Sequence, residues 1–336
     1  MNHKDGEVAA FKEAKPRIEA LMSEHGIEAE VGSFFYMLPF AIRDPRVRQM
    51  QLDVQKREQF PLYHVQTPII GVHSLDFYGK NRSHALDNGC LLETAVTHAG
   101  DLAQYSPTTP DVSTHSGVFV FPTAPKGSYV GPGSYTLEEF DEKKEEILQD
   151  TKKGFRNFSE LVQSQGLTPL LENEPAANYE RGVIDGFKNS PYLIYKPFAS
   201  ANIMKDIAPY HTFDSNHFAA SSVALDKLIE NGIDPQSFVH LHAITQEDYN
   251  TKFGSHEAFL HDNVRALHLS NTQGIGVGLK SAWDIKHWGD DATNEGTLSR
   301  RDLRSFFSYA QENDIPAVLE MSYGTNGDPK NIPETK

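Results

Sequence analysis

The chain has little cysteine and no long apolar run. Its 336 residues include a single cysteine, Cys90, which excludes an internal disulfide and fits a reducing compartment. No apolar run approaches the ~18 residues that a membrane-spanning helix needs. The first residues, MNHKDGEVAAFKEAKPR, lack the apolar core of a secretory signal. We therefore expect a cytoplasmic protein without membrane association. Cys90 falls in a helical pattern, where a buried structural role is expected.

Basic residues are also scarce. The chain has 31 Lys and Arg against 46 Asp and Glu, which gives a formal net charge of −15. Non-specific binding to nucleic acid depends on Lys and Arg that neutralise phosphates. The composition therefore argues against a broad basic surface. It remains compatible with a local basic rim, or with bound metal ions whose charge the formal count omits.

Strand-like and helical segments alternate along the chain. We expect strands at 27–35, 62–75, 112–120, 167–171, 208–213, 264–269 and 317–321, with an extra strand at 192–195. We expect helices at 7–25 (interrupted near Pro16), 41–60, 83–104, 136–165, 219–231 and 298–313. Thr136 and Glu139 have the spacing of a capping box. The segments 121–135 and 272–296 are rich in Gly or Pro and predict loops.

This alternation favours a parallel sheet. Together with polar residues at the strand ends, it predicts a (β/α)8 TIM barrel, a single α/β domain. The barrel is expected over 27–323, after an N-terminal helix at 1–26 and before a polar tail at 324–336.

Most of the expected strands end on a His, Asp or Glu. These residues are His73 in GVHS, His115 in VSTHSG, Glu172 in PLLENEP, Asp214 and His217 in HTFDSNHF, His268 in VRALHLSN and Glu320 in AVLEM. Neutral imidazoles and carboxylates are ligands of divalent metals. Because strand ends of an α/β barrel meet on one face, the pattern predicts a metal site there.

These residues also have structural alternatives. Asp214 has the place of a helix N-cap, and His268 that of a hydrogen-bonded core histidine. A carboxylate that follows four or five apolar residues needs a partner. No basic residue ends an obvious strand, so a metal ion is the expected partner of Glu172 and Glu320. Glu174 is an alternative to Glu172, since both side chains could face the barrel mouth.

The Gly-rich loop adds one further candidate. His287 lies there, where a second metal or the substrate could be held, with Asp284, Asp290 and Asp291 as weaker candidates. The GIGVG stretch at 274–278 is not a dinucleotide-binding fingerprint, because it follows no βα turn and lacks the spacing of the third glycine.

Taken together, these motifs resemble those of the xylose-isomerase-like TIM barrels. That superfamily includes sugar isomerases, sugar epimerases and the endonuclease IV relatives (AP endonuclease family 2). The resemblance runs motif by motif from about residue 60 to residue 322. It implies a metal-binding quartet of Glu172, Asp214, His268 and Glu320.

The endonuclease IV type implies further ligands. GVHSLDFYG, THSG and DSNHFAAS are similar to its motifs, which adds His73, His115 and His217. Its strand-seven D-x-H motif is not intact here, and WDIKHWGDDATNEG, which contains His287, is the nearest stretch. A more remote resemblance, to multinuclear-iron barrel oxidases, rests on GIDPQSFVHLHAI.

The number of ligands distinguishes the possible functions. One metal takes about four protein ligands, so the seven strand-end residues indicate at least two ions, with Glu172 as a possible bridge. This favours a phosphoester hydrolase resembling endonuclease IV, with a two- or three-metal site that acts on a nucleic-acid phosphodiester. Divalent zinc is the expected metal, with manganese, magnesium or iron as alternatives. No protein partner is predicted.

The main alternative is a sugar isomerase or epimerase with one metal on the quartet. Glu172 and Glu320 would then transfer a proton on a small sugar. The acidic net charge and the altered D-x-H motif favour this alternative. A multinuclear-iron oxidase and a barrel that only binds a ligand are the remoter alternatives.

Overall fold

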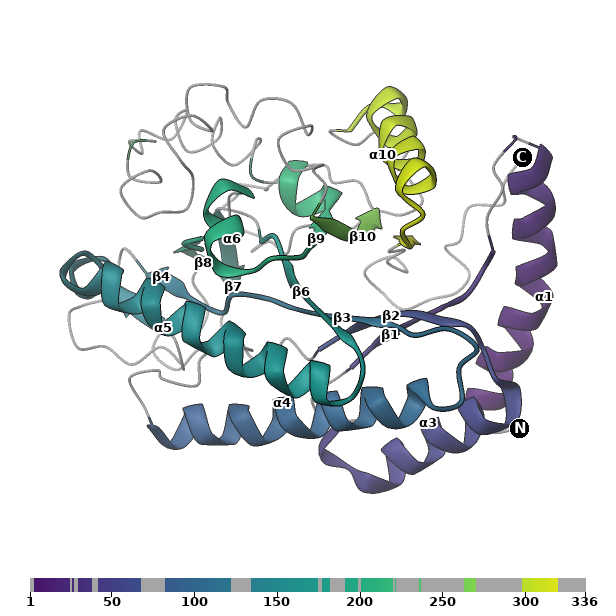
Figure 1. Ribbon diagram of the computed structural model, residues 1–336. Helices are drawn as coiled ribbons and strands as arrows, with labels where there is room; N and C mark the ends of the chain where they lie inside the picture. Colours follow the sequence, from purple (N-terminus) through teal and green to yellow (C-terminus); the bar gives the residue numbers. More distant parts are fainter. Residues whose placement is uncertain are drawn as a thin grey trace.

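The computed structural model describes residues 3–24, 26, 30–37, 42–67, 82–121, 134–174, 177–181, 191–198, 201–219, 221, 236, 263–269 and 298–319. Seven parallel strands form its main sheet (Figure 1). In sheet order these are β1 (Ser33–Tyr36), β2 (Leu62–Gln66), β3 (Asp111–Thr114), β6 (Thr168–Glu172), β9 (His211–Asp214), β10 (Val264–Leu269) and β11 (Ala317–Leu319). The sheet order follows the chain order, and every neighbouring pair is parallel.

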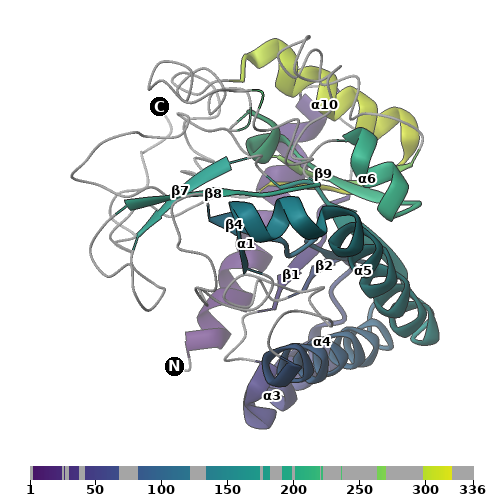
Figure 2. The same cartoon turned by 90° about the vertical axis from the view of Figure 1, so that its left-hand side faces the viewer.

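Helices connect these strands and cover the sheet. They are α1 (His3–Glu24), α3 (Pro45–Glu58), α4 (Arg82–Ala103), α5 (Leu137–Ser164), α6 (Ala201–Ile207) and α10 (Arg300–Asn313). In Figure 2, α3, α4, α5, α6 and α10 follow one another around one side of the sheet. Parallel strands joined in sequence by helices on the outside make a TIM-type α/β barrel. The fold class predicted from the sequence is therefore confirmed.

The barrel sheet places β10 directly beside β11. Leu267 pairs with Ala317 and Leu269 pairs with Leu319, so no strand lies between them. Each of the seven described strands overlaps one of the seven strands predicted from the sequence. The carboxyl ends of β6, β9 and β10 are therefore neighbours, which determines where their last side chains lie.

A second, four-stranded sheet accompanies the barrel. Its order is β5 (Ser134–Thr136), β4 (Phe119–Phe121), β8 (Pro191–Tyr195) and β7 (Ala177–Arg181). The prediction of one strand at 112–120 was wrong, because the chain turns at Gly117, whose φ is +76°. A left-handed backbone is accessible to glycine without strain. The turn separates β3 from β4 and leaves His115 at the bend.

Buried side chains hold the helices on the sheet. The inner face of α5 buries Phe155, Phe158 and Val162, and Phe306 of α10 packs on Phe213 of β9 with ring centroids 5.4 Å apart. Each fully buried phenylalanine stabilises the fold by roughly 1.5–3 kcal/mol. The predicted capping box begins α5, with Thr136 accepting from the backbone of Glu139 and the Glu139 side chain accepting from the backbone of Thr136.

Two further expectations were wrong. Cys90 is exposed on α4, because the helix buries the neighbouring face that carries Leu91, Leu92 and Ala95. Helix α1 continues through Pro16, since one missing N–H does not end a helix held by contacts such as the edge-to-face pair of Phe11 and Phe60. No helix among the described residues is long and apolar enough to span a membrane.

Candidate metal centre

Five of the predicted ligands come together at the carboxyl ends of four barrel strands. His115 follows β3, Glu172 ends β6, Asp214 ends β9, His217 follows it by three residues, and His268 lies one residue before the end of β10. All five are buried, with exposed fractions between 0% and 9%. Buried imidazoles and carboxylates need hydrogen-bond partners, opposite charges or a metal ion.

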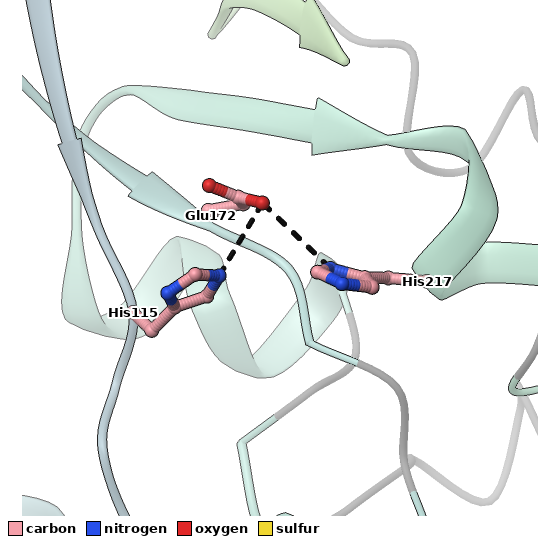
Figure 3. A group of neighbouring side chains, drawn as sticks. All are labelled: His115, Glu172 and His217. Atoms are coloured by element: carbon pink, nitrogen blue, oxygen red, sulfur yellow. Dashed lines mark ion pairs between the residues drawn. The ribbon is translucent and has the colours of Figure 1, made fainter. Parts of the chain in front are cut away.

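Glu172 is at the centre of this group. Its Oε1 lies 3.3 Å from His115 Nε2, 3.4 Å from His268 Nδ1 and 3.7 Å from His217 Nδ1. Figure 3 shows His115 and His217 on either side of this carboxylate. The two imidazole rings approach each other with centroids 5.9 Å apart. One carboxylate oxygen therefore faces three histidines from three different strand ends.

The ligand atoms fall into two overlapping groups. His115, Glu172 and His217 form one, and Glu172, Asp214 and His268 form the other. In each group the ligand atoms lie within 4.8 Å of one another, the spacing that one ion can span. Glu172 belongs to both groups, and its Oε1 is the oxygen that faces histidines of both, His115 and His217 of the first and His268 of the second.

Backbone hydrogen bonds orient Asp214 and His217. Asp214 Oδ1 accepts from the backbone N–H of His217 at 2.8 Å, so it caps the helical residues 215–219. Its Oδ2 lies 3.4 Å from His217 Nδ1. The two interpretations of Asp214, as a cap and as a ligand, are therefore compatible, because each uses a different oxygen.

Asn173 sets the tautomer of His217. Its carbonyl lies 2.7 Å from His217 Nδ1, so this nitrogen donates and Nε2 becomes the ligand atom. The Asn173 side chain also spans to β9: Nδ2 donates to the Asp214 carbonyl at 3.0 Å, and Oδ1 accepts from the Asp214 N–H at 2.6 Å. Asn173 thus fixes both neighbouring ligands. Sequence reasoning missed it, since an asparagine after a strand has no distinctive pattern.

A polar chain continues beneath the centre into the barrel. The rings of His268 and His64 meet edge to face with centroids 4.9 Å apart. His64 Nε2 lies 2.9 Å from Ser113 Oγ, and Ser113 donates to Gln66 Oε1. Since Ser113 donates onward, it accepts from His64, which places the His64 proton on Nε2. This chain links His268 to polar side chains of β2 and β3.

The local charges favour an ionised Glu172. Burial opposes ionisation, but the neighbouring imidazoles of His115 and His268 outweigh it and hold the pKa of the Glu172 carboxyl well below its usual range. Burial likewise opposes the charge on His115, and Glu172 outweighs it, so the pKa of the His115 imidazole is raised. Within the described residues, the Glu172 carboxylate and the His115 imidazole thus favour each other's charged form.

The site meets a chemical test for divalent metal. Glu172 Oε2 and His115 Nδ1 are buried and accept or donate no hydrogen bond within the described part of the chain. A buried polar atom without such a bond costs roughly 1–3 kcal/mol. A divalent cation bound to this mixed nitrogen and oxygen donor set would replace the histidine protons and satisfy the carboxylate.

Several predicted site residues lie outside the described residues. These are His73, His287 and Glu320, together with Asp284, Asp290 and Asp291. Whether they join the centre stays a prediction.

The structure also separates Glu172 from Glu174. Glu174 Oε2 lies 3.2 Å from Lys196 Nζ. Lys196 directly follows β8, so the expectation that no basic residue ends a strand was wrong. The Lys belongs to the second sheet, whose position beside the barrel a strand pattern does not reveal. Its partner is Glu174 and not Glu172.

Comparison with known proteins shows similarity at the level of the fold. No protein-family model matches the chain, and no curated protein matches it. A D-tagatose 3-epimerase-like protein is 15% identical with a TM-score of 0.47, over 86% of this chain and 81% of its own. The TTHB071 protein from Thermus thermophilus, soaked with ZnCl2, is 17% identical with a TM-score of 0.39, over 90% and 94% of the two chains.

A third solved structure is the 3-keto-D-glucoside 4-epimerase YcjR from E. coli. It is 10% identical with a TM-score of 0.43, over 93% of this chain and 88% of its own. The strand order of the chain itself shows the fold.

Proposed function

We propose that this chain is a divalent-metal-dependent phosphoester hydrolase with a centre of at least two ions. The observation that supports the proposal is the shared position of Glu172 in both ligand groups. A carboxylate shared by two ligand sets is suited to hold two neighbouring ions, as two-metal hydrolases do. Zinc is the metal that best fits the combination of imidazole and carboxylate donors.

Each residue of the proposed centre has a role. His115 and His217 hold one position, Asp214 and His268 hold the other, and Glu172 joins them. Two bound ions would lower the pKa of a water nucleophile and hold the attacking and leaving oxygens of a phosphoester. Asn173 keeps His217 in the tautomer that presents Nε2. The burial of the group excludes bulk water, which strengthens the electrostatic interactions within it.

The residues outside the described part of the chain complete the proposal. His73, His287 and Glu320 would add further ligands. The acidic net charge of −15 favours a compact phosphoester, or a phosphodiester gripped locally, over long duplex contacts.

A sugar isomerase or epimerase is the second candidate. The group of Glu172, Asp214 and His268 contains three members of the quartet expected for one metal. In that case His73 and His115 would contact sugar hydroxyls, and Glu172 and Glu320 would act as bases. The two candidates differ in the number of ions and in the bond that is broken.

Metal content and turnover together test the proposal. The purified chain is loaded with zinc or manganese, its metal content is measured by plasma mass spectrometry, and hydrolysis of bis(p-nitrophenyl) phosphate and of abasic duplex DNA is followed. We expect two or more ions per chain and phosphoester hydrolysis. His115→Ala should lose about one ion and most of the hydrolysis.

The matched control is His98→Ala. His98 is equally buried, but its Nε2 lies 3.0 Å from Gln51 Oε1, between α4 and α3. This variant should keep its metal. One ion per chain together with turnover of a ketose would overturn the hydrolase proposal in favour of the isomerase.

A further inference from the structure

A cation lies at the edge of the centre without a place in the ligand groups. Lys196 follows β8, which pairs with β4 through Tyr195 and Val120. Its Nζ lies 3.2 Å from Glu174 Oε2 and 5.1 Å from the ring centroid of Phe119. Glu174 follows Glu172 by two residues, and β4 follows His115 closely in the chain. The second sheet therefore brings Lys196 to the segment that carries the central carboxylate.

The burial of this pair is unusual for a surface ion pair. The side chain of Lys196 is 13% exposed and that of Glu174 is 4% exposed. Removing both charges from water costs more than a simple ion pair returns, unless further groups share the charge. Glu174 Oε1 has no hydrogen-bond partner within the described residues. Stability alone is thus a poor explanation for a charged pair at this position.

Among the described residues, the ammonium of Lys196 is held by Glu174 and Phe119, and these two contacts do not use all of its donors. Glu174 occupies one side of it and the face of Phe119 another, and an ammonium has three N–H donors. A compact lysine charge is suited to a phosphate oxygen. The side chain is 13% exposed, so the described residues do not enclose it fully.

We propose that Lys196 is a substrate-binding residue that donates to a non-bridging oxygen of the phosphoester, and that Glu174 is the positioning residue that holds its ammonium. This inference rests on the proposed function, because the phosphoester is the substrate it assumes. The substrate class is therefore anionic at the reacting group. An ammonium donates its strongest hydrogen bonds to anionic oxygens, so a fixed cation here favours an anionic reacting group over a neutral sugar.

The test uses Lys196→Met in the metal-loaded chain, with inorganic phosphate as the probe. Phosphate affinity is measured by calorimetry, metal content by plasma mass spectrometry, and KM and kcat with bis(p-nitrophenyl) phosphate. We expect full metal content, phosphate affinity at least about tenfold lower, and a raised KM, because a charged hydrogen bond is lost. Lys196→Arg should keep part of the affinity. The control Lys205→Met, on the exposed side of α6, should match the wild type.

A second variant covers the possibility that Lys196→Met fails to fold. Lys196→Met combined with Glu174→Gln leaves no buried charge unpaired, and such replacements are often neutral for stability. This double variant should also lose phosphate affinity with its metal retained. Glu174→Gln alone should lower the affinity less, since the ammonium remains but is held loosely.

The outcomes separate the two proposals. If phosphate affinity and KM are unchanged in a folded, metal-loaded Lys196→Met chain, the pair is structural and the inference is overturned. If the wild type hydrolyses no phosphoester but the variant still loses phosphate affinity, the anion-binding role of Lys196 is supported and the hydrolase proposal fails.

Discussion

Each end of the barrel sheet carries a carboxylate, buried at the carboxyl ends (Glu172) and half-buried at the amino ends (Asp111), and the two have different surroundings. At the carboxyl ends, Glu172 faces three histidines, and one of its oxygens takes part in no hydrogen bond among the described residues. At the amino ends, Asp111 begins β3 beside Thr168, the first residue of β6, which hydrogen-bonds to it. The carboxylate at the amino end thus has partners from the protein.

The amino end also has a cation with its own structural contact. Arg265 of β10 lies over the ring of Tyr210 with 4.9 Å from its guanidinium carbon to the ring centroid. Burial raises the pKa of Asp111 to about 6, and the Thr168 hydrogen bond and the charge of Arg265 only partly offset that rise. A buried polar residue therefore indicates function only where the fold leaves part of it without a protein partner.

The largest expected effect comes from Glu172→Gln. An amide offers one neutral oxygen in place of two charged ones, so it cannot bridge two ions. Turnover should fall by about 100- to 1000-fold, the loss usual for one electrostatic group in a site, and metal content should drop. Kinetics and plasma mass spectrometry measure both quantities. Glu58→Gln, an acid of α3 paired with Lys12, is the control. Unchanged metal content in Glu172→Gln would contradict the bridging role.

His217→Ala should have the next largest effect. The variant removes one ligand of the first group, so affinity for zinc should fall by about 100-fold or more, as seen when metal sites lose a key group. Competition with a chromophoric chelator measures this affinity. Both His217→Ala and the control His98→Ala should destabilise the fold by about 1–3 kcal/mol, because each removes a buried, hydrogen-bonded ring. If His98→Ala weakens zinc binding as much as His217→Ala does, the loss does not come from a ligand role of His217.

Asp111→Asn should act in the opposite direction, on stability alone. Because the pKa of Asp111 is about 6 in the fold against 3.8 ordinarily, the fold favours its protonated form. That contribution to stability is complete below pH 3.8 and is lost as the pH rises through 6. At pH 8 the ionised Asp111 carboxylate destabilises the fold. The neutral amide of Asp111→Asn should therefore raise the free energy of unfolding by about 1–2 kcal/mol.

Denaturant unfolding at about pH 4 and about pH 8 measures this effect, on either side of the Asp111 titration. The increase in the free energy of unfolding from Asp111→Asn should be present at the higher pH and absent at the lower. At each pH the zinc content of the variant should equal that of the wild type. A gain of equal size at the two pH values would show that titration of Asp111 is not its cause.

The smallest effect is expected for Arg265→Gln. Arg265 is exposed and its contact with Tyr210 is a cation–π pair at the surface, so its loss should cost about 0.5 kcal/mol. Thermal unfolding of the metal-free chain measures it. Zinc affinity should not change. A clear drop in zinc affinity would show that Arg265 at the amino ends of the strands influences the metal centre at their carboxyl ends.

Local patterns made a large part of the fold predictable. The capping box of Thr136 and Glu139 begins α5 where expected, and the run Val264–Leu269 forms β10 over its full length. Caps and apolar periodicity act over a few residues, so they can be read without the fold. The exposure of Cys90 could not be predicted in this way, because its place on α4 depends on which face meets the sheet.

The candidate site was predictable in its chemistry and less so in its pairing. His115, Glu172, Asp214, His217 and His268 each stood out at a strand end. Glu172 and Glu174 could not be distinguished, since they lie two residues apart on the same segment. Their difference comes from residues far away in the sequence: three histidines for Glu172 and Lys196 for Glu174.

By itself, the sequence determined the order of strands and helices and the types of donor at the strand ends, because both follow from neighbours along the chain. Only the tertiary structure decided that the chain turns at Gly117 into a second sheet, that Lys196 meets Glu174, and that Glu172 is shared by two ligand groups. Those features depend on contacts between segments tens of residues apart. Their geometry exists only once the sheet has brought the strand ends together.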